Sequence, residues 1–158
     1  MRVSVITISD RASRGEYEDR SGAEIECLLR EKFPEAEMSR DIVPDEPESI
    51  TAAFRKNSDA DYILTTGGTG ISPRDRTPEV TESYCDRAIP GIAERLRAES
   101  YSETPFSILS RGYAGIKDRT IIVNFPGSLK AVRLCVRILL PVMEHGLRMI
   151  RGEGHGDG

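Results

Sequence analysis

Residues 62–80 read Tyr-Ile-Leu-Thr-Thr-Gly-Gly-Thr-Gly-Ile-Ser-Pro-Arg-Asp-Arg-Thr-Pro-Glu-Val, and this stretch decides the fold. Its first five residues are apolar or β-branched, as in a buried strand, and a loop of glycines and hydroxyl side chains follows. Glycine lets backbone N–H groups approach a ligand closely, and the hydroxyls add further hydrogen-bonding groups. We therefore expect an anion-binding loop at the end of this strand, formed by Thr66, Gly67, Gly68, Thr69 and Gly70.

Charged residues follow the glycine loop directly. Arg74 can neutralise a phosphate, Asp75 can hold a metal ion, and Thr77 and Pro78 predict a helix start with Thr77 as the N-cap. The loop fits neither common phosphate fingerprint, because Pro73 replaces the third glycine of the dinucleotide motif and no Gly-Lys-Ser/Thr sequence follows. Rossmann and P-loop proteins are therefore not supported. A plain turn, with Asp75 in a solvated ion pair, stays the alternative.

The rest of the chain alternates between strand and helix patterns. Apolar and β-branched runs predict strands at 3–8, 38–43, 62–66 and 120–124. Helical periodicity predicts helices at 21–33, 48–56, 78–87, 90–101 and 132–150, the last with a kink near Pro141. Residues 106–110 fit either a strand or a short helix. This order is typical of an α/β domain whose mostly parallel sheet is covered by helices on both faces.

Several polar residues have ordinary structural interpretations. Ser21 and Glu24 form a capping-box pattern that predicts the start of the first helix, after a charged loop over residues 9–20. Asp45 lies where its carboxylate would cap the second helix, and Ser128 would cap the last one. From spacing alone, capping is the better interpretation of Asp45.

The same polar residues also have a functional interpretation. Ligands of parallel α/β sheets bind beyond the carboxyl ends of the strands. Asp10 and Asp45 follow the first two strands, the loop 66–75 follows the third, and the turn 126–128 follows the last. We therefore expect four separate segments to converge on one site, which Arg111 would join if the segment 106–110 ends nearby.

Composition restricts the possible chemistry. The 158 residues have a formal net charge of −4 and a pI near 5.3, which argues against a nucleic-acid or membrane-surface protein. Three separated cysteines, no signal-peptide pattern and no long apolar run predict a cytoplasmic protein. The two histidines, His145 and His155, lack metal-site spacing, so zinc sites and serine–histidine triads are disfavoured. Carboxylates, arginines, backbone amides and a hard metal ion remain for any catalysis.

The motifs taken together resemble one known family. They are Ile8-Ser-Asp-Arg-Ala-Ser13, Pro44-Asp-Glu46, Thr65-Thr-Gly-Gly-Thr-Gly70, Arg74-Asp-Arg-Thr-Pro-Glu79, Pro90-Gly91, Leu109-Ser-Arg111 and Asn124-Phe-Pro-Gly-Ser128. In this order they resemble the molybdopterin adenylyltransferases of molybdenum cofactor biosynthesis, and the resemblance covers almost the whole chain. It implies a three-layer αβα domain with a mostly parallel central sheet, expected here at residues 1–151 and followed by a flexible glycine-rich tail at 152–158.

The resemblance also implies an activity and its residues. The terminal phosphate of molybdopterin would attack the α-phosphate of ATP with Mg²⁺, in a homotrimer that passes its product to a molybdenum-inserting protein. Asp45 and Asp75 match the family's functional carboxylates and would position magnesium and substrate. Substrate would be bound by Ser9, Asp10, Thr66, Gly67, Gly68, Thr69, Gly70, Arg74, Ser110, Pro126, Gly127 and Ser128. A molybdopterin carrier or scaffold without turnover is the alternative, and the choice between molybdenum and tungsten stays open.

Overall fold

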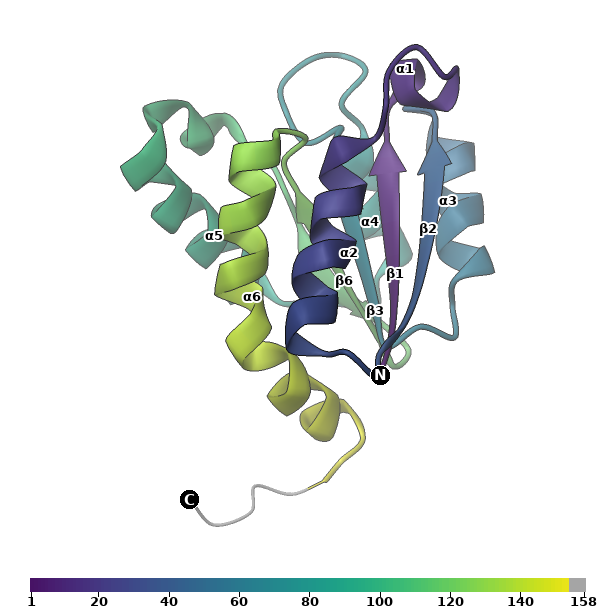
Figure 1. The fold of residues 1–158 in the computed structure, drawn as a ribbon, viewed down its shortest axis with the longest axis vertical. Coiled ribbons are helices and arrows are strands. Elements are labelled where there is room, and N and C mark those ends of the chain that lie inside the picture. The colour runs from purple at the N-terminus through teal and green to yellow at the C-terminus, as the bar shows by residue number, and fades with distance from the viewer. Residues whose placement is uncertain (154–158) are drawn as a thin grey trace.

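The computed structural model describes residues 1–153 and contains a six-stranded sheet between two layers of helices (Figure 1). The strands are β1 (Arg2–Ile8), β2 (Glu37–Val43), β3 (Tyr62–Thr66), β4 (Arg87–Ala88), β5 (Ala114–Lys117) and β6 (Thr120–Phe125). Their order is β2-β1-β3-β6-β5-β4. The first four strands of this order run parallel, and β5 and β4 add an antiparallel end. The predicted α/β fold with a mostly parallel sheet is confirmed.

Helices cover both faces of the sheet. They are α1 (Asp10–Ser13), α2 (Arg20–Lys32), α3 (Pro47–Lys56), α4 (Thr77–Tyr84), α5 (Pro90–Glu103), the 3-10 helix η1 (Pro105–Leu109) and α6 (Leu129–Ile150). The predicted long last helix is confirmed as α6, which stays helical through Pro141. No helix in residues 1–153 is long and apolar enough to cross a membrane. Most of the predicted tail, residues 154–158 with His155, lies outside the described residues.

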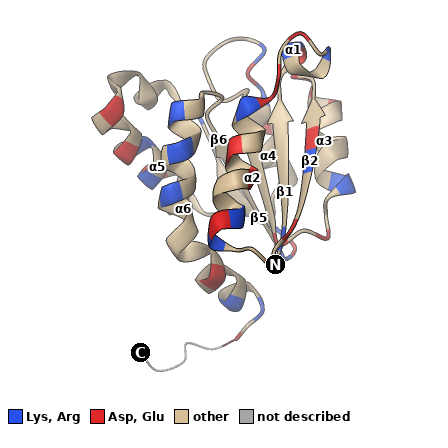
Figure 2. Ribbon diagram, in the orientation of Figure 1, with Lys and Arg blue, Asp and Glu red and all other residues tan. Residues whose placement is uncertain are grey.

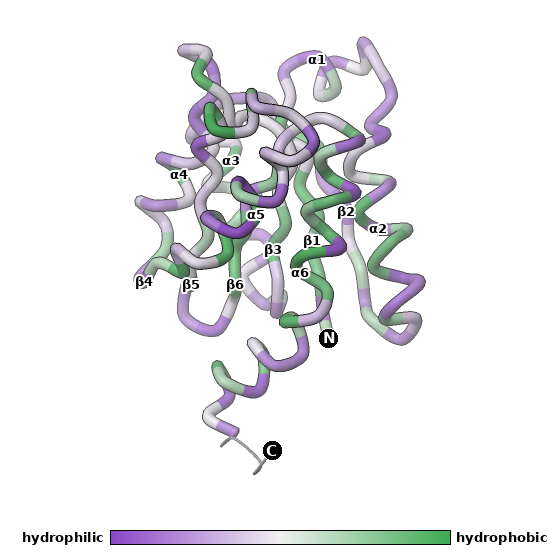
Figure 3. Tube along the Cα trace, turned by 90° about the vertical axis from the view of Figure 1, so that its left-hand side faces the viewer, coloured by the Kyte–Doolittle hydropathy of each residue, from purple (hydrophilic) through white to green (hydrophobic). Residues whose placement is uncertain are grey.

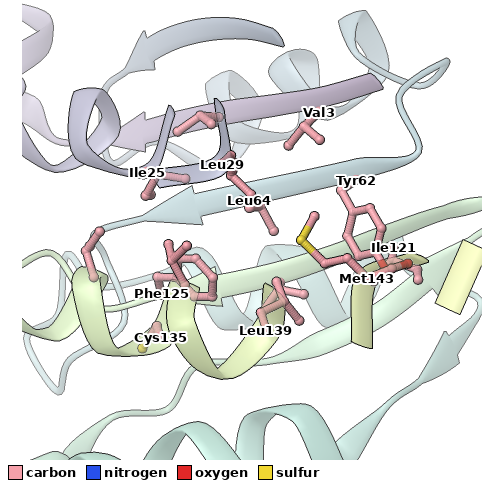
Figure 4. Close-up of a cluster of buried hydrophobic side chains, with 14 of the residues drawn as sticks. Val3, Ile25, Leu29, Tyr62, Leu64, Ile121, Phe125, Cys135, Leu139 and Met143 are labelled. Carbon is pink, nitrogen blue, oxygen red and sulfur yellow. The ribbon is translucent and has the colours of Figure 1, made fainter. Parts of the chain in front are cut away.

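The three central strands, β1, β3 and β6, are mainly apolar or β-branched and are covered on both faces. Every residue of β3 and β6 is buried, as are all of β1 except Arg2. One cluster joins these strands to α2, α5 and α6 and includes Ile25, Leu64 and Leu139 (Figure 4). A second cluster, with Ile50 and Phe54, joins the other face to α3 and α4. Hydrophobic residues accordingly follow the central strands (Figure 3), and most charged residues lie on the helices, on β2 and in the loops (Figure 2).

The antiparallel end of the sheet was not predicted. The helix predicted over 78–87 ends at Tyr84, because the backbone becomes extended at Cys85 and pairs with β5. The N–H of Asp86 donates to the carbonyl of Ile116 at 2.7 Å, and the N–H of Ile89 donates to Ala114 at 2.8 Å. Residues 87–88 therefore form a strand rather than the last turn of a helix. The ambiguous segment 106–110 forms η1.

The predicted start of the first long helix was also wrong. Asp19 caps α2, and its carboxylate accepts a hydrogen bond from the N–H of Gly22 at 2.8 Å. Ser21 instead donates to the carbonyl of Gly127, and Glu24 pairs with Arg133 on α6 at 2.6 Å. Both side chains of the supposed capping box thus connect α2 to the segment that follows β6. The expected loop before Asp19 contains the one-turn helix α1.

Candidate active site

The carboxyl ends of the four parallel strands lie along one edge of the sheet. The register aligns Ile8 with Val43 and aligns Thr66 with both Thr7 and Phe125. The segments that follow these strands therefore lie in a row in the order of the strands, beside α1 in Figure 1. The chain leaves β1 by α2 on one face of the sheet and leaves β3 by α4 on the other. Where the chain leaves two neighbouring parallel strands toward opposite faces of the sheet, a ligand crevice opens between the ends of those strands.

The glycine loop turns sharply at the start of this crevice. Gly67 and Gly68 have φ angles of +101° and +64°, which residues with a side chain rarely adopt. A Cβ atom on Gly67 would lie 2.2 Å from the carbonyl oxygen of Ile8, so the loop passes directly over the end of β1. The hydroxyl of Thr77 donates to the carbonyl of Gly67 at 3.1 Å, and the Thr77 N–H donates to Gly68 at 3.2 Å. Thr77 thus fixes the loop, while Arg76 is the N-cap residue of α4.

Asp10 and Asp45 connect the first two strand ends by a reciprocal pair of hydrogen bonds. The N–H of Asp10 donates to Oδ2 of Asp45 at 2.8 Å, and the N–H of Asp45 donates to Oδ1 of Asp10 at 3.0 Å. Asp45 is not a helix cap, because α3 has Glu46 at its N-cap position. Arg74 reaches across and forms ion pairs with Asp10 at 2.8 Å and with Glu46 at 2.9 Å. These contacts bring Asp10, Asp45 and Arg74 into one cluster.

The two carboxylates of this pair have opposite pKa shifts. Burial raises the pKa of Asp45, and the nearby charges of Asp10 and Asp75 add to the rise. Burial also disfavours the charged form of Asp10, but hydrogen bonds from Asp45 and Arg74 outweigh this effect and hold its pKa below the usual value. Both predicted catalytic carboxylates also approach the glycine loop, because a Cβ atom on Gly68 would lie 3.1 Å from Oδ1 of Asp45 and one on Gly70 would lie 2.8 Å from Oδ2 of Asp75.

Asp75 is held against the glycine loop by backbone contacts. Its Oδ2 accepts a hydrogen bond from the N–H of Ser72 at 2.8 Å, and a Cβ atom on Gly70 would lie 2.8 Å from the same oxygen. Arg111 fixes both sides of this turn by donating to the carbonyls of Gly70 at 2.7 Å and Asp75 at 2.6 Å. It also pairs with Glu79 of α4. Arg111 therefore reaches the loop, because η1 ends just before it.

A cavity of about 560 Å³ adjoins the glycine loop. The predicted site residues on its wall are Gly67, Gly68, Thr69, Gly70, Asp75, Ser110, Pro126, Gly127 and Ser128. The other predicted residues, Ser9, Asp10, Asp45, Thr66 and Arg74, are not part of this wall. The loop lies between the two groups, because Gly68 borders the cavity and a Cβ atom on it would lie 3.1 Å from Oδ1 of Asp45.

Three predicted site residues form hydrogen bonds that stabilise the protein itself. Two of them, Ser9 and Thr66, do not line the cavity, and the third, Ser128, does. Ser9 accepts a hydrogen bond from the N–H of Ala12 and caps α1. Thr66 donates to the carbonyl of Pro126 at 2.8 Å and so joins the loops after β3 and β6. Ser128 caps α6, as its position predicted, and also borders the cavity. The polar end of the site is therefore braced before any ligand binds.

Sequence reasoning did not predict the second wall of the cavity. It comes from α5, η1 and α6 and is largely apolar, with Ala93, Leu96, Phe106, Leu109, Ala131 and Cys135. Phe106 keeps 76% of its surface exposed, so η1 presents apolar side chains at the cavity rather than burying them in the core. In the sequence these residues look like ordinary core positions of helices. Only the packing of α5 beside α6 places them around one cavity.

The carboxylates near the glycine loop have the chemistry that a hard cation such as magnesium requires. Residues 1–153 contain no group of three or more histidines, cysteines or carboxylates placed to hold a metal. Asp45 and Asp75 nevertheless place carboxylate oxygens beside Gly68 and Gly70 of the glycine loop. Mg²⁺ is usually held by one or two carboxylates together with phosphate oxygens and water. Two carboxylates alone would therefore suit magnesium only together with oxygen ligands from a bound molecule.

This arrangement places the chain among the α/β domains whose ligand crevice lies at the carboxyl ends of parallel strands. More specifically, the chain belongs to the molybdopterin-binding domain family. Residues 4–145 match the family described as "Probable molybdopterin binding domain". The resemblance inferred from the motifs is thereby confirmed.

Known relatives agree over nearly the full length. The chain is 39% identical over 157 residues to a molybdopterin adenylyltransferase of Helicobacter pylori, covering 97% of this chain and 89% of the relative. The crystal structure of the molybdopterin biosynthesis enzyme MoaB from Thermus thermophilus is 42% identical, covers 96% of each chain and has a TM-score of 0.87. A structure of MogA is 37% identical, covers 95% of this chain and 99% of its own, and has a TM-score of 0.89.

The opposite pKa shifts predict opposite effects of two substitutions on stability. Because the pKa of Asp45 is raised in the folded state, its ionisation favours the unfolded chain, and stability falls as pH rises from about 4 through the raised pKa. We expect Asp45→Asn to increase the free energy of unfolding at pH 7, and this gain to shrink as pH falls through that window. Urea denaturation at several pH values measures the difference.

Asp10→Asn is the matched comparison for that prediction. The lowered pKa of Asp10 gives stability that is present above its unfolded pKa and is lost as pH falls through the lowered value. Asp10→Asn should therefore destabilise the protein at pH 7 and approach the wild type in acid. A loss of stability at pH 7 in both variants would contradict the interpretation of Asp45 as a carboxylate whose charge is costly to bury.

Proposed function

We propose that this protein is a molybdopterin adenylyltransferase that transfers AMP from Mg-ATP to the terminal phosphate of molybdopterin and releases pyrophosphate. The observation that carries the proposal is that the carboxylates of Asp45 and Asp75 both approach the glycine loop, which borders a cavity. The named activity of the Helicobacter pylori relative supports the same assignment.

The residues can be given roles in this reaction. An oxygen of the molybdopterin phosphate forms a bond to the α-phosphorus of ATP, while the bond from that phosphorus to the oxygen bridging to the β-phosphate breaks. Magnesium, when bound, would offset charge on the triphosphate. Asp45 and Asp75 would hold it, and the N–H groups of the glycine loop and of the start of α6 would orient phosphate oxygens. The apolar wall formed by α5 and η1 would exclude water from the substrate.

A transfer assay separates this enzyme from a carrier. Purified protein is incubated with molybdopterin, ATP and Mg²⁺, and both adenylylated molybdopterin and pyrophosphate are quantified by chromatography. We expect the two products in equal amounts and neither of them in the presence of a chelator. Tight binding of molybdopterin without either product would favour the non-catalytic carrier or scaffold.

We further propose that the protein forms a homotrimer in the cytoplasm and passes its product to a molybdenum-inserting protein. The groove between α5, α6 and β5, of about 530 Å³, is lined mainly by apolar residues including Ile92, Ile138, Val142 and Met149. Val142 and Met149 keep 49% and 57% of their surface exposed, which suits a contact between chains. The three cysteines Cys27, Cys85 and Cys135 are free, in agreement with a reducing compartment.

A charge placed in this groove should break the trimer. We expect Val142→Glu to convert a species of three chains into single chains, because the new carboxylate would have to be buried among apolar side chains. Light scattering after gel filtration measures the mass of each species. Glu48→Lys on the exposed surface of α3 is the control and should leave the mass unchanged. A wild type that is already monomeric would contradict the trimer.

A further inference from the structure

The cavity wall contains one cationic side chain whose role is not yet explained. Among the described residues that line the 560 Å³ cavity, Arg97 of α5 is the only lysine or arginine, and Asp75 is the only carboxylate. The rest of the wall consists of apolar groups, glycines and uncharged polar side chains. A cation in such surroundings has a strong influence on which ligand can bind.

Arg97 is fixed in place without being neutralised. Its Nη1 donates to the carbonyl of Gly112 at 2.9 Å, and its backbone carbonyl accepts from the hydroxyl of Ser107 at 3.4 Å. Its neighbour on α5, Arg95, forms an ion pair with Glu99 at 2.7 Å. Arg97 has no ion pair with any described residue, and within residues 1–153 its Nε and Nη2 atoms have no hydrogen-bond partner. Most of the five N–H donors of its guanidinium therefore remain available.

The position of Arg97 indicates which part of the substrate it contacts. The groups suited to phosphate come from the loop after β3 and from the turn before α6. Arg97 belongs to the other wall, formed by α5 and η1, where it also borders an adjoining hollow of about 320 Å³. A substrate whose phosphate lies at the glycine loop would direct its ring system toward α5. A guanidinium fork suits the planar carbonyl and nitrogen acceptors of such a ring.

We propose that Arg97 is a specificity-determining residue that binds the pterin ring of the substrate through the donors that the protein leaves unused. This inference rests on the proposed function for the identity of the substrate. A purely structural role, in which Arg97 only ties α5 to Gly112, is the competing explanation. Binding measurements can separate the two, because one hydrogen bond to Gly112 needs neither a charge nor a fork.

The test uses the full chain and measures binding rather than turnover. Arg97→Gln keeps one amide donor for Gly112 without the charge, and Arg97→Lys keeps the charge without the planar fork. Arg55→Gln, on the exposed surface of α3, is the matched control. Dissociation constants are measured by calorimetry for molybdopterin and for a pterin phosphate that lacks the two sulfurs, both without ATP. The KM for ATP and the Tm of each variant are measured in parallel.

We expect Arg97→Gln to weaken the binding of both pterins by about 10- to 100-fold, with a smaller loss for Arg97→Lys. The KM for ATP, the Tm and the control variant should stay close to the wild type. Unchanged pterin affinity in Arg97→Gln would overturn the proposal, as would a parallel rise in the KM for ATP. A loss for molybdopterin alone would assign Arg97 to the sulfurs and overturn the assignment to the ring.

The outcome is distinguishable from a failure of the proposed function. A wild-type protein that binds molybdopterin but forms no adenylylated product would refute the adenylyltransferase. The effect of Arg97 on pterin affinity would still be measurable in that protein, because the calorimetric experiment needs no turnover.

Discussion

Asp75→Asn is expected to lower the rate of adenylyl transfer by about 10²- to 10³-fold while the protein stays folded. The substitution keeps the shape of the side chain, and the amide oxygen can still accept the hydrogen bond from the N–H of Ser72. What it removes is the negative charge that would hold magnesium next to the triphosphate. Transfer to phosphate depends mainly on alignment and electrostatic stabilisation, so this loss should appear in the chemical step rather than in folding.

Three measurements separate the catalytic role of Asp75 from a structural one. Single-turnover transfer should fall, the Tm should change little, and the Mg²⁺ concentration for half-maximal rate should rise. Glu31→Gln, at the exposed end of α2, removes the same charge far from the glycine loop and should transfer AMP at the wild-type rate. Wild-type turnover by Asp75→Asn would remove this carboxylate from the mechanism.

The parallel part of the fold was predictable because its signals are local. Runs such as Tyr62–Thr66 and Thr120–Phe125 consist mainly of apolar and β-branched residues, which indicates strands covered on both faces. Each of these segments directly follows a parallel strand: Asp10, Asp45 and the glycine loop. Because parallel strands end at the same edge of the sheet, the three segments were expected to lie close together there. These predictions needed only the order of the elements and the rule that parallel strands end on the same side.

What could not be predicted depends on contacts between distant segments. Residues 87–88 form a strand only because β5 offers them a pairing edge, and β5 itself contains Gly115 and has only four residues. Asp45 looked like a helix cap, because no pattern in the sequence indicates its hydrogen bonds with Asp10, 35 residues away. Arg97 likewise occurs in an ordinary helical segment, and only tertiary packing places it on the cavity wall.

Gly67→Ala is expected to cost about 3 kcal/mol or more of folding stability, which corresponds to a fall in Tm of roughly 6–12 °C for a domain of this size. Two separate effects contribute to this loss. The φ angle of +101° is unfavourable for alanine, and its methyl group would lie 2.2 Å from the carbonyl oxygen of Ile8. Relief of this overlap requires the backbone of the loop to move away from the end of β1. Thermal and urea denaturation measure the loss.

Two other glycines allow the causes to be separated. Gly15 has a φ of +71° but open space around it, so Gly15→Ala should cost only the conformational part, about 1 kcal/mol. Gly91, in the first turn of α5, has neither a positive φ nor a close neighbour, and Gly91→Ala should be neutral or slightly stabilising. If Gly67→Ala cost no more than Gly15→Ala, the close approach to Ile8 would not constrain the loop. A larger loss in Gly67→Ala would mean that the end of β1 fixes the position of the loop, and with it the positions of Asp75 and the cavity wall, before any substrate binds.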